Sequence, residues 1–199
     1  NGVGDSVTAP VASKARGFYS SAFSVSLTSA GATSIRYTTD GSTPSATSGT
    51  VYTAPINITT TTVLRAVGVA AGNVTSSVVS YTYVFVASVL NQGAGISGFP
   101  DGRQVWVGGS DFVPEDTAMD QSIVTSSTYS SRIAGGMTSI PTMSVSAPIG
   151  TIFGVNGFYD TDDNEVPVSV EMLYPDGSSE MMNGGAESHS HNRLKRSMR

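Results

Sequence analysis

The stretch SIRYTTDGSTP, residues 34–44, decides the fold. Ile35 and Tyr37 alternate with polar side chains, which is the period-two pattern of a strand with one buried face. Asp40-Gly41 then favours a tight turn, because glycine tolerates positive φ and an aspartate side chain bonds its own backbone. Pro44 ends the pattern. The stretch therefore predicts a strand and a turn of a β protein, with Asp40 as a turn residue rather than a ligand or catalytic carboxylate.

Similar short strand patterns recur on both sides of this stretch. Roughly seven strands fall within about 75 residues, with turn signals such as Gly72-Asn73 between them, which is typical of a small antiparallel sandwich. Residues 1–14 are small and polar and are interpreted as a linker or leading strand. The predicted strands are Phe23–Leu27, Ile35–Thr39, Val51-Tyr52, Ile56–Ile58, Val63–Val69 and Val78–Val86.

Composition agrees with an all-β chain. Charged residues make up only 13% of the 199 residues, and cysteine is absent, which excludes disulfides and thiolate metal sites. No apolar run approaches the ~20 residues of a membrane span. No leader sequence opens the chain, so we expect either a cytosolic protein or a leader removed before Asn1.

The formal net charge of −5 hides an asymmetry along the chain. Four of the ten basic residues lie in the last seven positions, and residues 1–192 alone carry a net charge of −9, from six basic and fifteen acidic residues. An acidic body argues against nucleic acid as the main partner.

An ordered set of motifs suggests a family for the first half. RGFYSSAFSVSLTS, IRYTTDGSTPS, VYTAPINIT, TTVLRAVGV and SSVVSYTYVF follow one another between residues 15 and 86. In this order and spacing they resemble the chitobiase/β-hexosaminidase C-terminal-type domain. The resemblance implies an immunoglobulin-like β-sandwich attached to secreted carbohydrate-active or surface proteins, without catalytic residues of its own.

Residues 87–137 are interpreted as a connector. Gly93–Gly98 fits the dinucleotide-binding pattern G-x-G-x-x-G, but Phe99–Gly102 would break the helix that such a site needs, so a loop is favoured. Trp106 lies in a short strand-like segment and is a weak candidate for stacking on a sugar ring. One helix is predicted over Asp116–Gly135, with Gly135-Gly136 as its end.

Residues 138–199 predict a small, incomplete β region. Ile140–Val145 and Val166–Leu173 alternate as strands, and Pro175–Gly177 predicts a hairpin that returns through Glu180–Met182. The order SIPTMSVS, GTIFGVNGFYD, EVPVSVEMLYPDGS and NGGAESHSHNRLKRSMR is similar to the start of CotH-like proteins, which resemble atypical protein kinases. The resemblance implies metal-binding acids further downstream, so we expect this chain to be a truncated portion of a larger protein.

Two groups of side chains resemble metal ligands. Asp160, Asp162, Asp163 and Glu165 form an oxygen-rich loop, but the glycine and distal glutamate of a calcium loop are missing, and a solvated acidic turn is favoured. His189 and His191 lie two residues apart, and no third ligand is fixed by the sequence. We therefore predict no metal, no cofactor and no catalytic residues.

The sequence predicts a non-catalytic module of a secreted or cell-surface bacterial protein, acting as a spacer or binding domain, with carbohydrate as the candidate ligand. Two alternatives stay open. The chain is a structural subunit that assembles with copies of itself through exposed strand edges, or it is a fragment of a CotH-like kinase.

Overall fold

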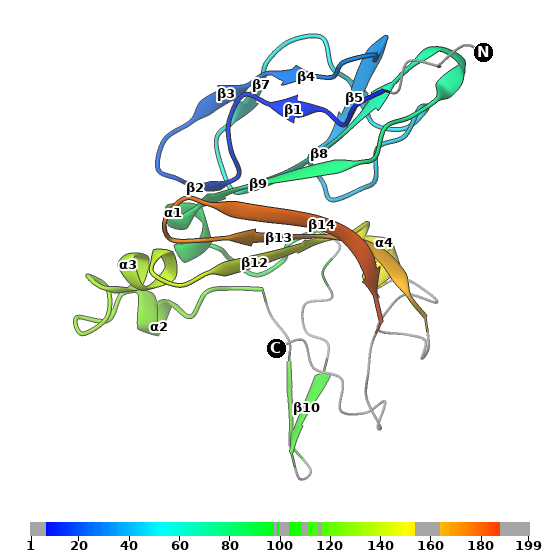
Figure 1. The fold of residues 1–199 in the computed structure, drawn as a ribbon. Coiled ribbons are helices and arrows are strands. Elements are labelled where there is room, and N and C mark those ends of the chain that lie inside the picture. The colour runs from blue at the N-terminus through cyan, green and yellow to red at the C-terminus, as the bar shows by residue number, and fades with distance from the viewer. Residues whose placement is uncertain are drawn as a thin grey trace.

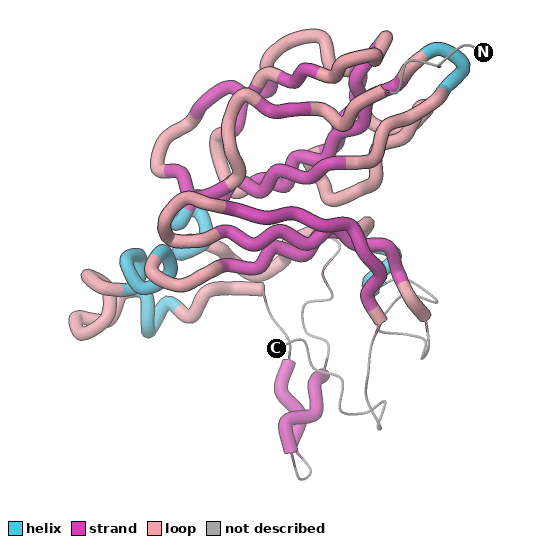
Figure 2. The backbone as a smooth tube through the Cα atoms, viewed as in Figure 1, coloured by secondary structure: helices cyan, strands magenta, loops and turns pink. Residues whose placement is uncertain are grey.

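A computed structural model of the chain describes residues 7–97, 99, 104–108, 111–114, 117–153 and 164–187, with the backbone alone at 104–108 and 111–114. Strands make up most of its regular structure, and the helices are short (Figure 2). The predicted all-β class is confirmed. No helix in the described ranges has the length and apolar character needed to cross a bilayer.

The first half of the chain forms a sandwich of short strands (Figure 1). One layer is a sheet in the order β2-β9-β8-β5-β6, and the facing layer consists of the pairs β1-β4 and β3-β7. The strands are β1 (Val11–Ala12), β2 (Gly17–Tyr19), β3 (Phe23–Val25), β4 (Leu27–Thr28), β5 (Ser34–Thr38), β6 (Thr50–Val51), β7 (Ile56–Ile58), β8 (Thr62–Val69) and β9 (Val79–Phe85). The 3-10 turn η1 (Ala71–Asn73) joins β8 to β9, as the Gly72-Asn73 pattern predicts.

The sandwich core follows from the alternation along the strands. Leu64 and Ala66 of β8 and Tyr83 and Phe85 of β9 point into the space between the layers and are buried. Burying an aliphatic or aromatic side chain of this size contributes about 1.5–3 kcal/mol, before the cost of ordering the chain. The other buried members are Val25, Leu27, Ile35, Ile56 and Ile58.

The pairing of β2 with β9 departs from the predicted antiparallel sandwich. Gly17 to Tyr19 run parallel to Tyr83 to Phe85. A parallel pair needs a long connection, and these two strands lie at opposite ends of the sandwich segment. The local pattern of β2 does not indicate that its partner is a strand more than 60 residues further along the chain.

Short helices and a hairpin follow the sandwich. Two short helices, α2 (Gln121–Val124) and α3 (Ile133–Thr138), replace the single helix predicted over Asp116–Gly135. Gly135 and Gly136 lie inside α3 instead of ending a helix. The serine and threonine residues between the helices bond the backbone locally, which competes with helix formation. The remaining elements here are α1 (Val86–Leu90), β10 (Gln104–Gly108), β11 (Asp111–Pro114) and α4 (Ile149–Phe153).

The last described elements form a three-stranded antiparallel sheet. Its strands are β12 (Thr142–Ser146), β13 (Val166–Leu173) and β14 (Ser179–Ala186), in the order β12-β13-β14. The predicted hairpin at Pro175–Gly177 is present, with Gly177 at φ 84°. This sheet lies against the outer face of β8 and β9, so the molecule has three β layers (Figure 1).

A buried carboxylate joins the two sheets. Glu171 of β13 is fully buried, and its Oε1 accepts hydrogen bonds from Arg16 Nε at 2.7 Å and from the Thr82 backbone N–H at 3.0 Å. The Thr82 hydroxyl donates to the other carboxylate oxygen. Arg16 also donates through Nη2 to the Ser80 carbonyl at 2.8 Å. β2 pairs with β9 only from residue 83 onward. At residues 80–82 the side chains of Arg16 and Glu171 therefore bond backbone groups of β9 that a neighbouring strand would otherwise bond.

A second buried charge ties a surface loop to the same sheet. Arg65 of β8 is 4% exposed, and its Nη1 donates to the Gly41 carbonyl and the Thr43 hydroxyl, both at 2.9 Å. Its Nη2 donates to the Ser169 hydroxyl of β13 at 3.4 Å. Burial lowers the pKa of Arg65, because the charged form loses hydration. The Asp40–Gly41 turn is thus fixed to the interface between the sheets.

Replacing Glu171 with glutamine is expected to lower the free energy of unfolding by about 3–5 kcal/mol, because Arg16 is left without its buried counter-charge. Urea denaturation followed by circular dichroism measures the change. The matched control is Glu180→Gln on exposed β14, which is expected to stay within about 0.5 kcal/mol of the native chain. Equal values for the two variants would show that the pair does not hold the sheets together.

Candidate functional site

A polar pocket lies beside the Asp40–Gly41 turn. It has a volume of about 310 Å³ and is formed where the end of β5 and the following turn meet the start of β6. Hydroxyl groups dominate its lining, so it suits a ligand that exchanges hydrogen bonds rather than an apolar one. The lining residues are Tyr37, Thr38, Thr39, Asp40, Ser42, Gly49 and Thr50.

The turn that forms one wall of the pocket is held by its own side chains. Asp40 Oδ1 accepts hydrogen bonds from the Ser42 backbone N–H at 3.0 Å and from the Ser42 hydroxyl at 2.5 Å. The Thr38 hydroxyl donates to the Ser42 carbonyl at 2.6 Å. These contacts agree with the prediction of Asp40 as a turn residue, and the same residue lines the pocket.

The opposite wall depends on Gly49. Its φ is 93°, a conformation that favours glycine, and a Cβ there would lie 2.9 Å from the Tyr37 carbonyl. Arg36 Nη1 donates to the Gly49 carbonyl at 2.8 Å and fixes this wall to β5. Tyr37, which also lines the pocket, is half-buried and packs against the sandwich core, so its ring is not an open stacking platform.

The pocket carries negative charge at neutral pH. The hydrogen bond from the Ser42 hydroxyl lowers the pKa of Asp40 below its ordinary value. An ionised carboxylate beside several hydroxyl groups accepts hydrogen bonds from sugar hydroxyls or weakly attracts a cation. In the described part of the chain, no three His, Asp or Glu side chains gather as a metal site would require.

The predicted metal-loop residues have different outcomes. Asp160, Asp162 and Asp163 lie outside the described residues, as do His189 and His191. Glu165 is exposed, and its carboxylate lies over Gly185 of β14, where a Cβ would find no room. This contact gives Glu165 a packing role at the start of β13.

The structure locates the backbone of two features predicted in the connector, Trp106 and residues 93–97 of the glycine pattern. Trp106 lies on β10 opposite Phe112 of β11, and sugar stacking by Trp106 stays a prediction. Within the glycine pattern, residues 93–97 form a loop with no helix opening on them, which agrees with the predicted loop. Phe99 contacts Phe153 of α4, with ring centroids 5.4 Å apart.

The buried charges between the sheets are the residues that sequence reasoning did not single out as functional. Glu171 and Ser169 lie on the same side of β13 as Leu173, and the alternation of Val166–Leu173 correctly separates the two faces. The alternation along β13 does not indicate that the face with Ser169 and Glu171 is the one that packs against the sandwich. The sequence did contain one indication of a buried charge, because Arg65 on β8 interrupts an otherwise apolar face.

The strands of the first half of the chain define a β-sandwich domain. Residues 14–80 match the Chitobiase/beta-hexosaminidase C-terminal domain family, which confirms the predicted resemblance for this part of the chain. The match ends inside β9 and leaves the three-stranded sheet outside it. Nothing in the comparisons supports the CotH-like resemblance of residues 138–199. No curated protein and no solved structure matches the chain.

Ser42→Ala is expected to raise the pKa of Asp40 toward its ordinary value, because the carboxylate loses the hydrogen bond that stabilises its charge. Carboxyl NMR titration measures this pKa. Since the native pKa is lowered, Asp40 stabilises the fold above the unfolded pKa, and this contribution is lost as pH falls through the native pKa. Ser48→Ala is the control in the same loop, and an equal shift there would contradict the assignment.

Proposed function

We propose that this chain is a non-catalytic accessory module of an exported or cell-surface protein, and that it serves as a rigid spacer. The observation that carries the proposal is the buried Arg16–Glu171 pair between the sandwich and the three-stranded sheet. A spacer must hold the regions at its two ends in a fixed relation. The pair opposes a hinge between the sheets, because opening it would separate Arg16 from the fully buried Glu171 carboxylate and break their charge-assisted hydrogen bond.

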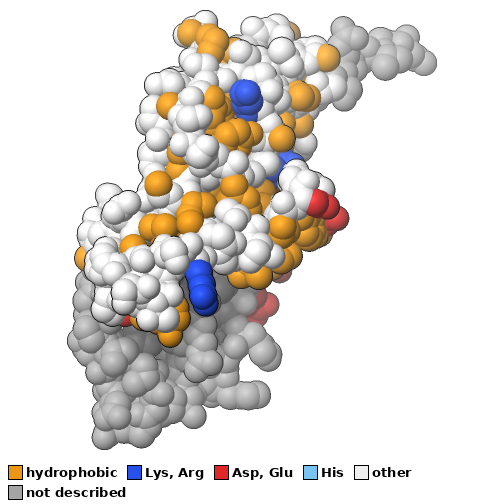
Figure 3. All heavy atoms as spheres, turned by 90° about the vertical axis from the view of Figure 1, so that its left-hand side faces the viewer, with side chains coloured by type: hydrophobic (Ala, Val, Ile, Leu, Met, Phe, Trp, Pro, Cys, Tyr) orange, Lys and Arg blue, Asp and Glu red, His pale blue; other side chains and the backbone are white. Residues whose placement is uncertain are grey.

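Several features support a spacer over an enzyme. The matched family is an accessory domain found in carbohydrate-active enzymes. The buried charged side chains of the interface, Glu171 and Arg65, form hydrogen bonds between the sheets. On the face shown in Figure 3, Lys and Arg side chains stand singly among uncharged surface, which is unlike a nucleic-acid-binding patch.

Carbohydrate binding at the pocket is the second candidate. It is favoured by the hydroxyl-rich lining around Asp40 and by the association of the matched family with carbohydrate-active enzymes. The half-buried position of Tyr37 restricts the contact to sugar hydroxyl groups, without ring stacking. We therefore propose weak binding of a chain end or a single sugar unit.

The spacer proposal predicts one narrow distance distribution between the layers. The chain has no cysteine, so Val11→Cys on β1 and Met182→Cys on β14, both exposed, can carry a pair of spin labels. Pulsed electron paramagnetic resonance is expected to give a single narrow peak, which broadens when Glu171→Ala is added. The control pair, Val11→Cys with Val74→Cys inside the sandwich, is expected to be unaffected. A broad distribution in the chain with native Glu171 would refute a rigid spacer.

The binding candidate predicts that Thr50→Val weakens binding of N-acetylglucosamine oligomers by roughly fivefold, since one hydrogen bond contributes about 1 kcal/mol. Isothermal titration calorimetry measures the affinity. Thr47→Val, in the same loop but outside the pocket lining, is the matched control. Absence of heat with the native chain would remove the carbohydrate candidate and leave the spacer proposal intact.

A further inference from the structure

The two faces of the three-stranded sheet differ in what they contact. Ser144, Glu171 and Asn183 point toward the sandwich, where each bonds a residue of β9 or the residue before it. The register places the intervening side chains on the outward face. They are Met143 and Val145 of β12, Val170 and Met172 of β13, and Glu180 and Met182 of β14.

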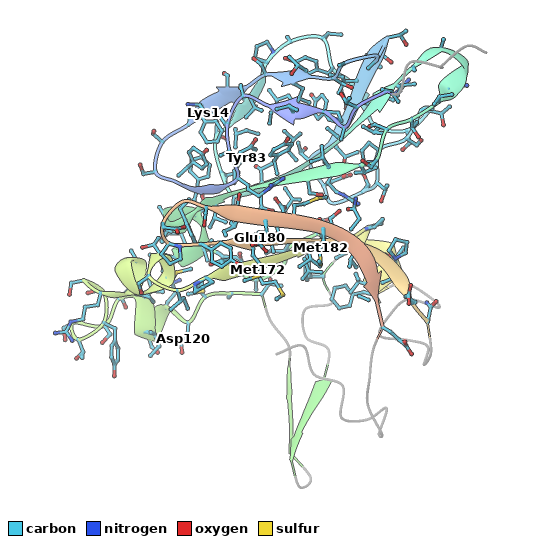
Figure 4. All side chains as sticks on the ribbon, in the orientation of Figure 1. Lys14, Tyr83, Asp120, Met172, Glu180 and Met182 are labelled. Carbon is cyan, nitrogen blue, oxygen red and sulfur yellow. The ribbon has the colours of Figure 1, made fainter. Side chains whose placement is uncertain are left out.

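The outward face is apolar, and it is buried at Val166 and Val168 but open around β12 and the middle of β14. Met143 is 62% exposed, Val145 55% and Met182 66%, while Val170 and Met172 between them are half-buried. Figure 4 shows Met172, Glu180 and Met182 close together on adjacent strands. Exposed apolar side chains on β12 and β14, joined by half-buried ones on β13, mark an interaction surface, whereas single ones need no explanation. Methionine also adapts its shape to partners of different sequence.

Charge indicates the kind of partner. The strands β12, β13 and β14 contain no Lys or Arg, and Glu180 lies on the outward face beside Met182, with Asp176 in the hairpin turn at its end. Two copies placed face to face would bring their Glu180 carboxylates into one apolar interface, where like charges repel. A partner with Lys or Arg beside its apolar side chains would neutralise Glu180.

We infer that the outward face of β12–β14 is a docking surface for a basic amphipathic segment of another polypeptide. Its apolar side chains lie over Met143, Val145 and Met182, and a Lys or Arg pairs with Glu180. Contact with the apolar side chains supplies most of the affinity, and the charge pair sets the preference for basic over acidic segments. This surface is separate from the pocket and from the interface that supports the spacer function.

The test uses the full chain and a fluorescent peptide of alternating leucine and lysine, seven residues long, with fluorescence anisotropy as the readout. Met143→Thr with Met182→Thr is expected to weaken binding roughly tenfold, and Glu180→Lys roughly fivefold. Threonine keeps the strand preference, and urea denaturation checks that each variant folds. The matched control is Val11→Thr with Val74→Thr, two valines equally exposed on the sandwich, which is expected to leave the affinity unchanged.

Four results would overturn the inference. The first is equal affinity of the methionine and valine variants. The second is equally tight binding of a peptide of alternating leucine and glutamate. The third is a dimer in light scattering that the methionine variant abolishes, since the face would then belong to a second copy. The fourth is a tenfold gain in affinity on removing residues 188–199, which would make the chain's own basic segment the occupant.

Discussion

Burial of the Glu171 carboxylate is the constraint on which the arrangement of the sheets depends. A carboxylate without hydration is tolerated only when its lone pairs are satisfied, and here Arg16, the Thr82 amide and the Thr82 hydroxyl satisfy them together. These donors come from two places on the sandwich, so the carboxylate fits in one position. A shift of β13 by one residue would move Glu171 to the outward face and replace it with an apolar side chain. The register of the third layer is therefore fixed by a charge as well as by apolar packing.

Local patterns were sufficient to predict most of the sandwich. Phe23–Leu27 alternates so regularly that its apolar face follows from the sequence, and Val25 and Leu27 are indeed buried. Val63–Val69 is also a strand as predicted, but both of its faces are largely buried. The prediction was wrong where the outcome depends on distant partners. The parallel pairing of β2 with β9 and the division of the predicted helix at 116–135 are both set by contacts or backbone competition that periodicity does not record.

At the candidate site, too, locally determined features were predictable and features set by distant partners were not. Asp40 was predicted as a turn residue because the chemistry of an Asx turn is local, and its bonds to Ser42 agree. The role of Glu171 was not predictable, although its strand was. Alternation on β13 separates Ser169 and Glu171 from Val170 and Met172, and ordinary burial preferences assign the polar pair to solvent. The structure buries Ser169 and Glu171 completely and leaves Val170 and Met172 half-buried, because complementary donors on the sandwich satisfy the polar face at this interface.

The order of synthesis determines when the edge of β9 at Thr82 can be completed, because Glu171 lies far downstream of this strand. Arg16 and Glu171 are 155 positions apart, and a ribosome delivers the chain from its N-terminus at about 5–20 residues per second. The sandwich strands have all emerged once Phe85 has, and Arg16 is already present to bond the Ser80 carbonyl, but the Thr82 amide waits several seconds longer for the Glu171 carboxylate. During that interval the nascent chain presents an unpaired strand edge, which is the feature through which β proteins misassemble with one another. Misassembly is therefore expected mainly in the interval after the sandwich has been synthesised and before the three-stranded sheet has been added.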